Sequence, residues 1–263
     1  MFKSETKEET TKYATLIKNL FFMFARILLL SPYINNVVFL TTNFESETVY
    51  VRRKLNVSNV VSLYVVVTIL FTQLISCTFL LCRKFVIFAS SCLFLIIITQ
   101  SIIFDLFLSV DYAAVDLALF GGLILLVVEA SYKDDHCFVK SQNNNMYYSI
   151  TQLLGRVLLV CMFTTLLHFK SSLLDLFHDT VVCMLAVLIM FGYKTKFSAS
   201  ALIVWLLAFN LKQNQFWKHK NNLPLKNFYQ QEFLHVLSVV GGFCMLFKLG
   251  PGELSIDQSK KLK

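Results

Sequence analysis

The chain has 263 residues, of which 56% are hydrophobic and only 15% are charged. Soluble domains contain about 45–50% apolar and about 25% charged residues, so this composition excludes an ordinary soluble domain and indicates an integral membrane protein. The net charge of +8 comes from basic residues spread over short segments, with no basic block interleaved with aromatic residues, which argues against nucleic-acid binding.

Long uncharged runs locate the membrane spans. No charged residue lies between Lys54 and Arg83, or between Lys84 and Asp105. Each run reaches the roughly 20 residues that cross the hydrocarbon core as a helix. We therefore expect an all-α, polytopic bundle of about eight membrane helices, at residues 16–40, 60–81, 85–104, 113–130, 148–169, 173–193, 197–211 and 233–249. Pro32 predicts a kink in the first helix, because proline removes a backbone donor.

Three short matches in the same order suggest that the chain is an internal repeat. They pair Ala25–Leu29 with Gly155–Leu159, Arg83–Phe85 with Lys194–Phe197, and Leu119–Gly122 with Val239–Gly242. The predicted units are a first four-helix repeat with a cytosolic head (1–132), a polar linker (133–147), a second repeat (148–252) and a cytosolic tail (253–263). Four helices in each half predict a parallel repeat about an axis along the membrane normal. Chance similarity between apolar segments is the alternative.

Glycines and arginines inside the spans have structural interpretations. Glycine pairs let helix backbones approach closely in a membrane, so we expect helix packing at Gly121, Gly122, Gly241 and Gly242. Arg26 and Arg156 each lie a turn or two inside a helix at its cytosolic end. Snorkelling to the headgroups is the favoured interpretation. An internal ion pair is the alternative, because buried charges in membranes are often functional.

Residues with catalytic potential do not form a recognisable pattern. The five histidines are scattered, no metalloprotease or Ser/His/Asp motif occurs, and no two cysteines have Cys-x-x-Cys spacing. We therefore expect no enzyme activity and no catalytic, cofactor-binding or metal-binding residue. Asp105, Asp111 and Asp116 cluster around the predicted lumenal turn between the third and fourth spans, where they are either solvated loop charges or contacts for a cationic ligand group.

Two lysines near the end of the chain match a sorting address. Lys260 and Lys261 follow an apolar helix, a Gly-Pro-Gly stop and a short polar tail. This is the dilysine form of retrieval signal that coat protein I reads, and such addresses add no membrane anchoring themselves. A solubilising basic tail is the alternative. A working address requires a cytosolic carboxyl terminus, and the larger share of Lys and Arg in the predicted cytosolic segments agrees with that orientation.

Several segments combine apolar runs with polar residues at defined offsets. They are Leu154–Phe169, Gly192–Lys196, Val204–Leu206 with Asn210, Asn214–Trp217, Gly241-Gly242, Leu249–Gly252, Ser255, Asp257 and Lys260-Lys261. These segments closely resemble the Surfeit locus protein 4 family of cargo receptors. The resemblance covers nearly the whole chain and is densest from Leu154 onward.

The resemblance implies a multi-pass endoplasmic reticulum protein that cycles through the intermediate compartment to the Golgi. Such receptors bind soluble secretory cargo in the lumen, commonly through an apolar amino-terminal leader. They enter coat protein II vesicles and return with coat protein I. The implied partners are therefore secretory cargo, both coats and the lipid bilayer, and no cofactor is implied. A homo-oligomer is left open.

The chain departs from the family pattern at the lumenal side. Asn35, Asn36 and Phe39 stand where the family has an acidic pair followed by a basic residue, and Asp116 stands where an amide is usual. Asn35, Asn36, Asp111 and Asp116 are the candidate cargo contacts. A small-molecule or ion transporter of the endomembrane system and a membrane scaffold are the competing functions, although apolar span centres disfavour a transporter.

Overall fold

The computed structural model describes residues 2–104, 110–134, 142–161, 173–219, 222–250 and 255. All regular secondary structure in these ranges is helical, which confirms the all-α prediction. The elements are α1 (Phe2–Thr42), α2 (Phe44–Leu55), α3 (Asn59–Leu81), α4 (Val86–Ile103), α5 (Val110–Asp134), α6 (Gln142–Cys161), α8 (Leu173–Phe191), α9 (Thr195–Gln213), the short 3₁₀ helix η2 (Phe216–His219) and α10 (Leu223–Leu249).

Four of the described helices are long and apolar enough to cross a membrane. These spans are Asn19–Thr42, Asn59–Leu81, Val86–Ile103 and Ala113–Ser131, and they overlap the first four predicted spans closely. Two shorter apolar helices cover Ser149–Val160 and Thr180–Phe191. The protein is thus a helical membrane bundle, and the full number of eight spans stays a prediction.

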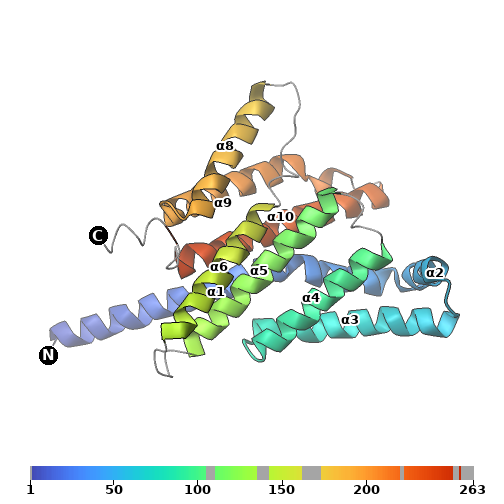
Figure 1. Cartoon of the computed structure of the whole chain (residues 1–263), viewed down its shortest axis with the longest axis horizontal. Helices are drawn as coiled ribbons and strands as arrows, with labels where there is room; N and C mark the ends of the chain where they lie inside the picture. Colours follow the sequence, from blue (N-terminus) through green and yellow to red (C-terminus); the bar gives the residue numbers. More distant parts are fainter. Residues whose placement is uncertain are drawn as a thin grey trace.

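The centre of the bundle consists of α1, α5, α6 and α10. The most extensive helix contacts join α1 to α10 and α5 to α6, and α10 also packs on α5. Figure 1 shows α3 and α4 lying side by side on one flank and α8 projecting away on the other. The buried core runs through the central helices and includes Leu29, Leu126, Leu159 and Phe243.

The two glycine pairs lie at the closest approaches of the central helices. A Cβ on Gly121 would lie 2.8 Å from the Gly155 carbonyl oxygen of α6, and a Cβ on Gly241 would lie 2.7 Å from the Ala25 carbonyl oxygen of α1. Because both obstacles are backbone atoms, only glycine fits at these two positions.

The second glycine of each pair faces a leucine side chain. Gly122 contacts Leu29 of α1, and Gly242 contacts Leu159 of α6. In each pair, the first glycine therefore packs on the backbone of one helix and the second packs on a leucine of another. The α5 pair packs on the backbone of α6 and a leucine of α1, whereas the α10 pair packs on the backbone of α1 and a leucine of α6.

Two short helix connections have the same backbone geometry. Arg83 and Phe85 between α3 and α4 have left-handed φ values of 59° and 50°, and Gly192 and Lys194 between α8 and α9 have values of 69° and 44°. The capping hydrogen bonds also match, since Arg83 N–H donates to Leu80 and Gly192 N–H donates to Ile189. This alignment of Phe85 with Lys194 differs in register from the sequence match, which paired Phe85 with Phe197.

Pro32 lies inside α1, which continues without interruption on both sides. Proline cannot donate to the carbonyl one turn earlier, which belongs to Leu28. The Ser31 hydroxyl donates to that carbonyl at 2.6 Å and to the Leu234 carbonyl of α10 at 3.2 Å. The gap in the α1 ladder is therefore filled locally, and the same hydroxyl contacts α10.

Helix α2 occupies the segment between the first two predicted spans, for which the sequence predicted no helix. Glu45 and Glu47 stand in its first turn and three basic residues stand in its last turn, which complements the helix dipole. Asn56 ends the helix in a left-handed conformation, and the Ser58 hydroxyl caps the start of α3. Partial burial raises the pKa of the Glu47 carboxyl.

We predict that Gly241→Ala lowers the stability of the bundle by about 1–3 kcal/mol, because the new methyl group meets backbone atoms that cannot move aside. Gly242→Ala is the matched control, since its methyl group meets only the end of the Leu159 side chain. Thermal unfolding of the purified protein in detergent measures both. Equal losses in the two variants would show that the backbone approach at Gly241 is not the limiting contact.

Candidate functional site

Polar side chains gather around one stretch of α1 inside the bundle. Asn36 donates to Gln73 of α3 at 3.0 Å, and Gln230 of α10 donates to Asn35 at 2.7 Å. On the neighbouring helices, Ser101 of α4 donates to the Asp116 carboxylate of α5. We call this group the polar layer: Tyr33, Asn35, Asn36, Gln73, Ser101, Asp116 and Gln230.

Tyr33 is a further polar side chain on the same stretch of α1. Its side chain is buried, and its hydroxyl has no hydrogen-bond partner within the described part of the chain. The same hydroxyl lies within electrostatic range of Asp116 and Cys77. A buried hydroxyl without a partner costs free energy, so the Tyr33–Asp116 region offers a donor and an acceptor to an incoming polar group.

The polar layer contains three of the four candidate cargo contacts. Asn35, Asn36 and Asp116 are half-buried, and their side chains bond to residues of α10, α3 and α4 respectively. Asp111 belongs to the first turns of α5, but its side chain lies outside the described residues, as do Lys260 and Lys261.

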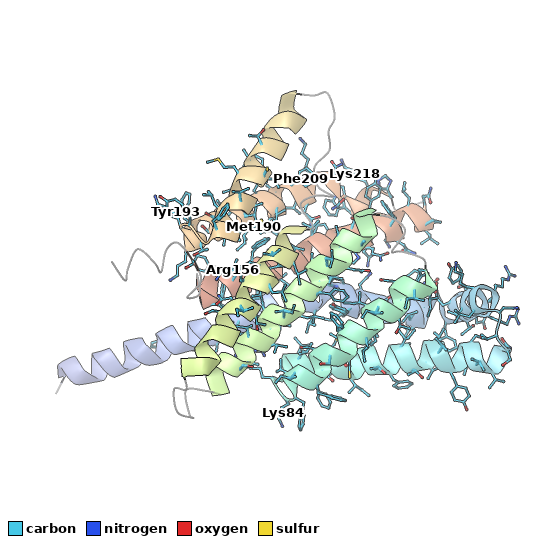
Figure 2. All side chains as sticks on the ribbon, in the orientation of Figure 1. Lys84, Arg156, Met190, Tyr193, Phe209 and Lys218 are labelled. Atoms are coloured by element: carbon cyan, nitrogen blue, oxygen red, sulfur yellow. The ribbon has the colours of Figure 1, made fainter. Side chains whose placement is uncertain are left out.

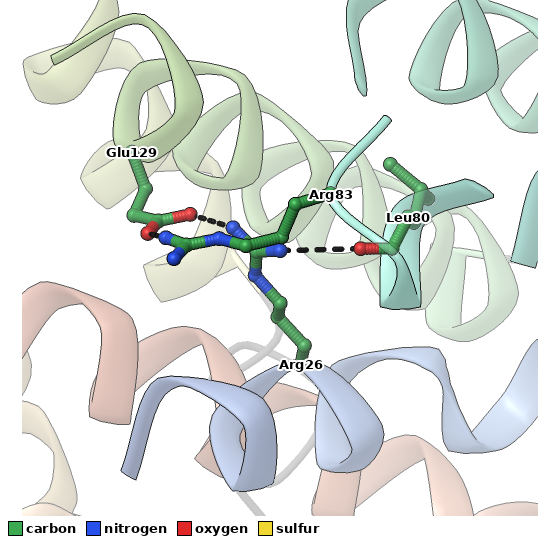
Figure 3. A network of polar contacts seen from close by, with 4 residues as sticks. All are labelled: Arg26, Leu80, Arg83 and Glu129. Atoms are coloured by element: carbon green, nitrogen blue, oxygen red, sulfur yellow. Dashed lines mark hydrogen bonds and ion pairs between the residues drawn. The ribbon is translucent and has the colours of Figure 1, made fainter. Parts of the chain in front are cut away.

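A charged network lies nearer the α3–α4 turn, away from the polar layer. The Arg26 guanidinium of α1 pairs with one oxygen of the Glu129 carboxylate of α5, and Arg83 of the α3–α4 turn pairs with the other. Arg26 also donates to the Leu80 carbonyl at 3.2 Å. Figure 3 shows both arginines converging on the single carboxylate.

Two of the three charged side chains in this network are buried, so each must have a partner of opposite charge. Arg26 is 1% exposed and Glu129 is 3% exposed, whereas the Arg83 side chain is 28% exposed. Arg26 is thus paired inside the bundle. The favoured interpretation from the sequence, that Arg26 extends to the headgroups, is therefore wrong, and the internal ion pair is confirmed. Removing one partner of a buried ion pair leaves an uncompensated charge. The two ion pairs of Glu129 therefore hold α1, α5 and the α3–α4 turn together.

Arg156, the counterpart of Arg26, also remains inside the bundle. It is 1% exposed, and Figure 2 shows it on α6. Its guanidinium donates to the Gly250 carbonyl at 3.3 Å, and Gln152 donates to the same oxygen at 2.8 Å. Gly250 follows the last residue of α10, so these bonds fix the end of α10 against α6.

Glu129, Tyr33, Gln73 and Gln230 were not among the candidate residues. Glu129 carried a usable signal, because an acidic residue near the end of an apolar span must find a cation. The other three are uncharged and gave no signal beyond their polarity. Among the described residues, no three His, Cys, Asp or Glu side chains are grouped to hold a metal ion.

Comparison with known proteins gives consistent matches. The model of the SURF4 family matches residues 1–262. The Surfeit locus protein 4 homolog of Drosophila melanogaster is 31% identical over 93% of this chain and 91% of its own length. The ER-derived vesicles protein ERV29 of Saccharomyces cerevisiae is 30% identical over 77% of this chain and 64% of its own. No solved structure gives a significant match.

We predict that Glu129→Leu destabilises the bundle by about 3–5 kcal/mol, because Arg26 is left buried without a counter-charge. The double variant Arg26→Leu with Glu129→Leu should recover most of this loss, because no charge then remains buried and Arg83 is free to turn to solvent. A double-mutant cycle from detergent unfolding measures the coupling. Additive losses would contradict the proposed pairing energy.

Proposed function

The chain belongs to the SURF4 family, and from that membership we propose that it is a cargo receptor of the endoplasmic reticulum. It binds soluble secretory proteins in the lumen, leaves in coat protein II vesicles and returns from the Golgi with coat protein I. The observation that carries this proposal is the match of the family model to residues 1–262. The family resemblance noted in the sequence is thereby confirmed.

Two further observations support a role in vesicle traffic. A relative that shares 30% identity is named for vesicles derived from the endoplasmic reticulum. Four described helices have the length and composition of membrane spans, as a multi-pass receptor of that membrane requires. The names of the matching family and of this relative indicate a trafficking role in those proteins.

The polar layer is our proposed cargo site, at the lumenal end of the bundle. A soluble cargo that presents an apolar amino-terminal leader offers an ammonium group and apolar side chains. Asp116 supplies a negative charge for the amine, while Asn35 and Asn36 supply amide contacts. Charged contacts of this kind fix orientation and specificity, and the apolar walls supply the rest of the affinity.

We further propose that the bundle is a duplicated four-helix unit. The reciprocal glycine contacts support this, because Gly121 packs on α6 as Gly241 packs on α1. The matching left-handed residues in the α3–α4 and α8–α9 turns support it as well. The proposed cytosolic end then holds Arg26, Arg156 and the tail with Lys260 and Lys261, and the polar layer faces the lumen.

We predict that Asp116→Asn weakens cargo capture about tenfold or more, because a charge-assisted hydrogen bond to the cargo amine contributes about 1.5–3 kcal/mol. Asp111→Ala should weaken capture as well. Recovery of crosslinked secretory cargo from cells measures the effect. The matched control is Glu45→Ala, which removes an exposed acid from α2 at the same end of the bundle.

Cargo capture that is undiminished in Asp116→Asn and Asp111→Ala would remove both residues from the site. Capture that falls equally in Glu45→Ala would indicate a general effect of negative charge at that end. Only selective loss supports a contact between Asp116 and cargo.

We predict that Lys260→Ser with Lys261→Ser moves the protein forward to the Golgi and slows secretion of its cargo, because the retrieval address is lost. Fluorescence imaging and a secretion assay measure the two effects together. Lys263→Ser, which removes a lysine of the same tail outside the pair, should change neither. Retention in the endoplasmic reticulum after loss of both lysines contradicts the retrieval role.

A further inference from the structure

Helix α2 presents a cluster of positive charge at the end of the bundle. Its last turn contains Arg52, Arg53 and Lys54, of which Arg53 and Lys54 are exposed. Its acidic residues lie in the first turn, at the other end of the helix. Figure 1 shows α2 nearly end-on beside the start of α3, across the direction of the membrane spans, as a helix lying in the membrane interface would be.

A groove of about 450 Å³ opens between α3 and α4, within the range typical of small-ligand pockets. Its walls are mainly apolar, with Val65, Ile69 and Leu95 prominent, and Thr68, Thr72 and Thr99 add hydroxyls. The α3 side of the groove runs from Val61 to Thr72, a rise of about 17 Å along a helix. That depth is about half of a 30 Å hydrocarbon core, the thickness of one leaflet.

The groove begins in the first turn of α3, the helix that follows α2 in the chain. Val51 of α2 packs in one apolar cluster with Val66 of α3 and Ile103 of α4, and Val65 and Ile69, which line the groove, border the same cluster. Tyr50 stacks on Phe104 with ring centroids 5.2 Å apart. These contacts hold the last two turns of α2 against α3 and against the end of α4.

We propose that this end of the bundle binds an anionic glycerophospholipid. Arg52, Arg53 and Lys54 bind its phosphate and headgroup, and one acyl chain fills the groove between α3 and α4. Tyr64, which is 65% exposed in the groove near the start of α3, lies at the depth where tyrosines anchor at the headgroups.

The combination of depth and charge selects this occupant. A partner helix, including one from a second copy of the chain, would contact α3 along its whole length and would have no need of the three cations. An acyl chain of a single leaflet reaches the depth of the groove, and its anionic headgroup then lies at the level of α2. The helix dipole alone favours basic residues in the last turn of α2, but it gives no preference between lipids.

The proposed lipid site is independent of the cargo proposal, because it lies on α2, α3 and α4 and involves no residue of the polar layer. A bound phospholipid is a ligand that does not follow from membership of the SURF4 family. Loss of lipid binding therefore says nothing about cargo capture, and the reverse also holds.

The test is native mass spectrometry of the purified full-length chain titrated with phosphatidylserine or phosphatidylcholine. The wild-type chain should bind phosphatidylserine more tightly. Arg52→Gln with Arg53→Gln should weaken binding of phosphatidylserine by about fivefold per charge removed. Thr68→Trp, which fills the groove and leaves the cations in place, should weaken binding of both lipids.

The matched control is Lys84→Gln with Lys196→Gln, which removes two exposed basic residues, one from the α3–α4 connection and one from the first turn of α9, and should leave phosphatidylserine binding unchanged. Detergent unfolding confirms that each variant is folded. Equal affinity for the two lipids overturns the proposal, as does wild-type binding in Arg52→Gln with Arg53→Gln. A dimer of the chain that Thr68→Trp abolishes also overturns it, since the groove would then hold a second copy.

Discussion

The close approach of α1 to α10 and of α5 to α6 is the contact on which the rest of the bundle depends. Lipid tails are as apolar as the side chains of the helices, so moving a side chain from lipid into the bundle gains little free energy. Membrane helices therefore associate through close packing and polar contacts. Gly121 and Gly241 allow that packing because a side chain at either position would meet a backbone atom of the facing helix. Everything else in the fold is attached to these four central helices.

The polar residues of the bundle divide between two levels. Near the α3–α4 turn, Glu129 pairs with both Arg26 and Arg83. Arg156, beside Gly192 of the α8–α9 turn, fixes the end of α10. Around Tyr33, the side chains are mainly neutral amides and hydroxyls with one carboxylate, Asp116. Each level keeps a buried polar atom without a hydrogen-bond partner among the described residues, Arg26 Nε in the first and the Tyr33 hydroxyl in the second. The two levels differ in charge, because the polar layer contains one carboxylate and no cation. That difference is our reason for proposing the polar layer as the site for a ligand with a positive charge.

Much of the fold follows from the sequence, and its limits have physical causes. Uncharged runs located α3 and α4 within a residue or two, because the hydrocarbon core excludes charge over a known length. The α2 segment has mixed charges and only 12 residues, so it resembles a loop until Val51 is seen packed on its neighbours. Arg26 gave no sign of its partner, because Glu129 lies 103 residues away along the chain. Pairing over such a distance depends on tertiary structure that no local pattern reveals.

The central claim is that the polar layer faces the lumen and the carboxyl-terminal tail faces the cytosol. Labelling of single cysteines by a membrane-impermeant maleimide in sealed endoplasmic reticulum vesicles tests it most directly, with the native cysteines replaced. Cysteine placed at Lys263 should react in intact vesicles, and cysteine placed at Ser46 on α2 should react only after detergent opens them. The opposite pattern, or both sites reactive from one side, would contradict the orientation on which the receptor account rests.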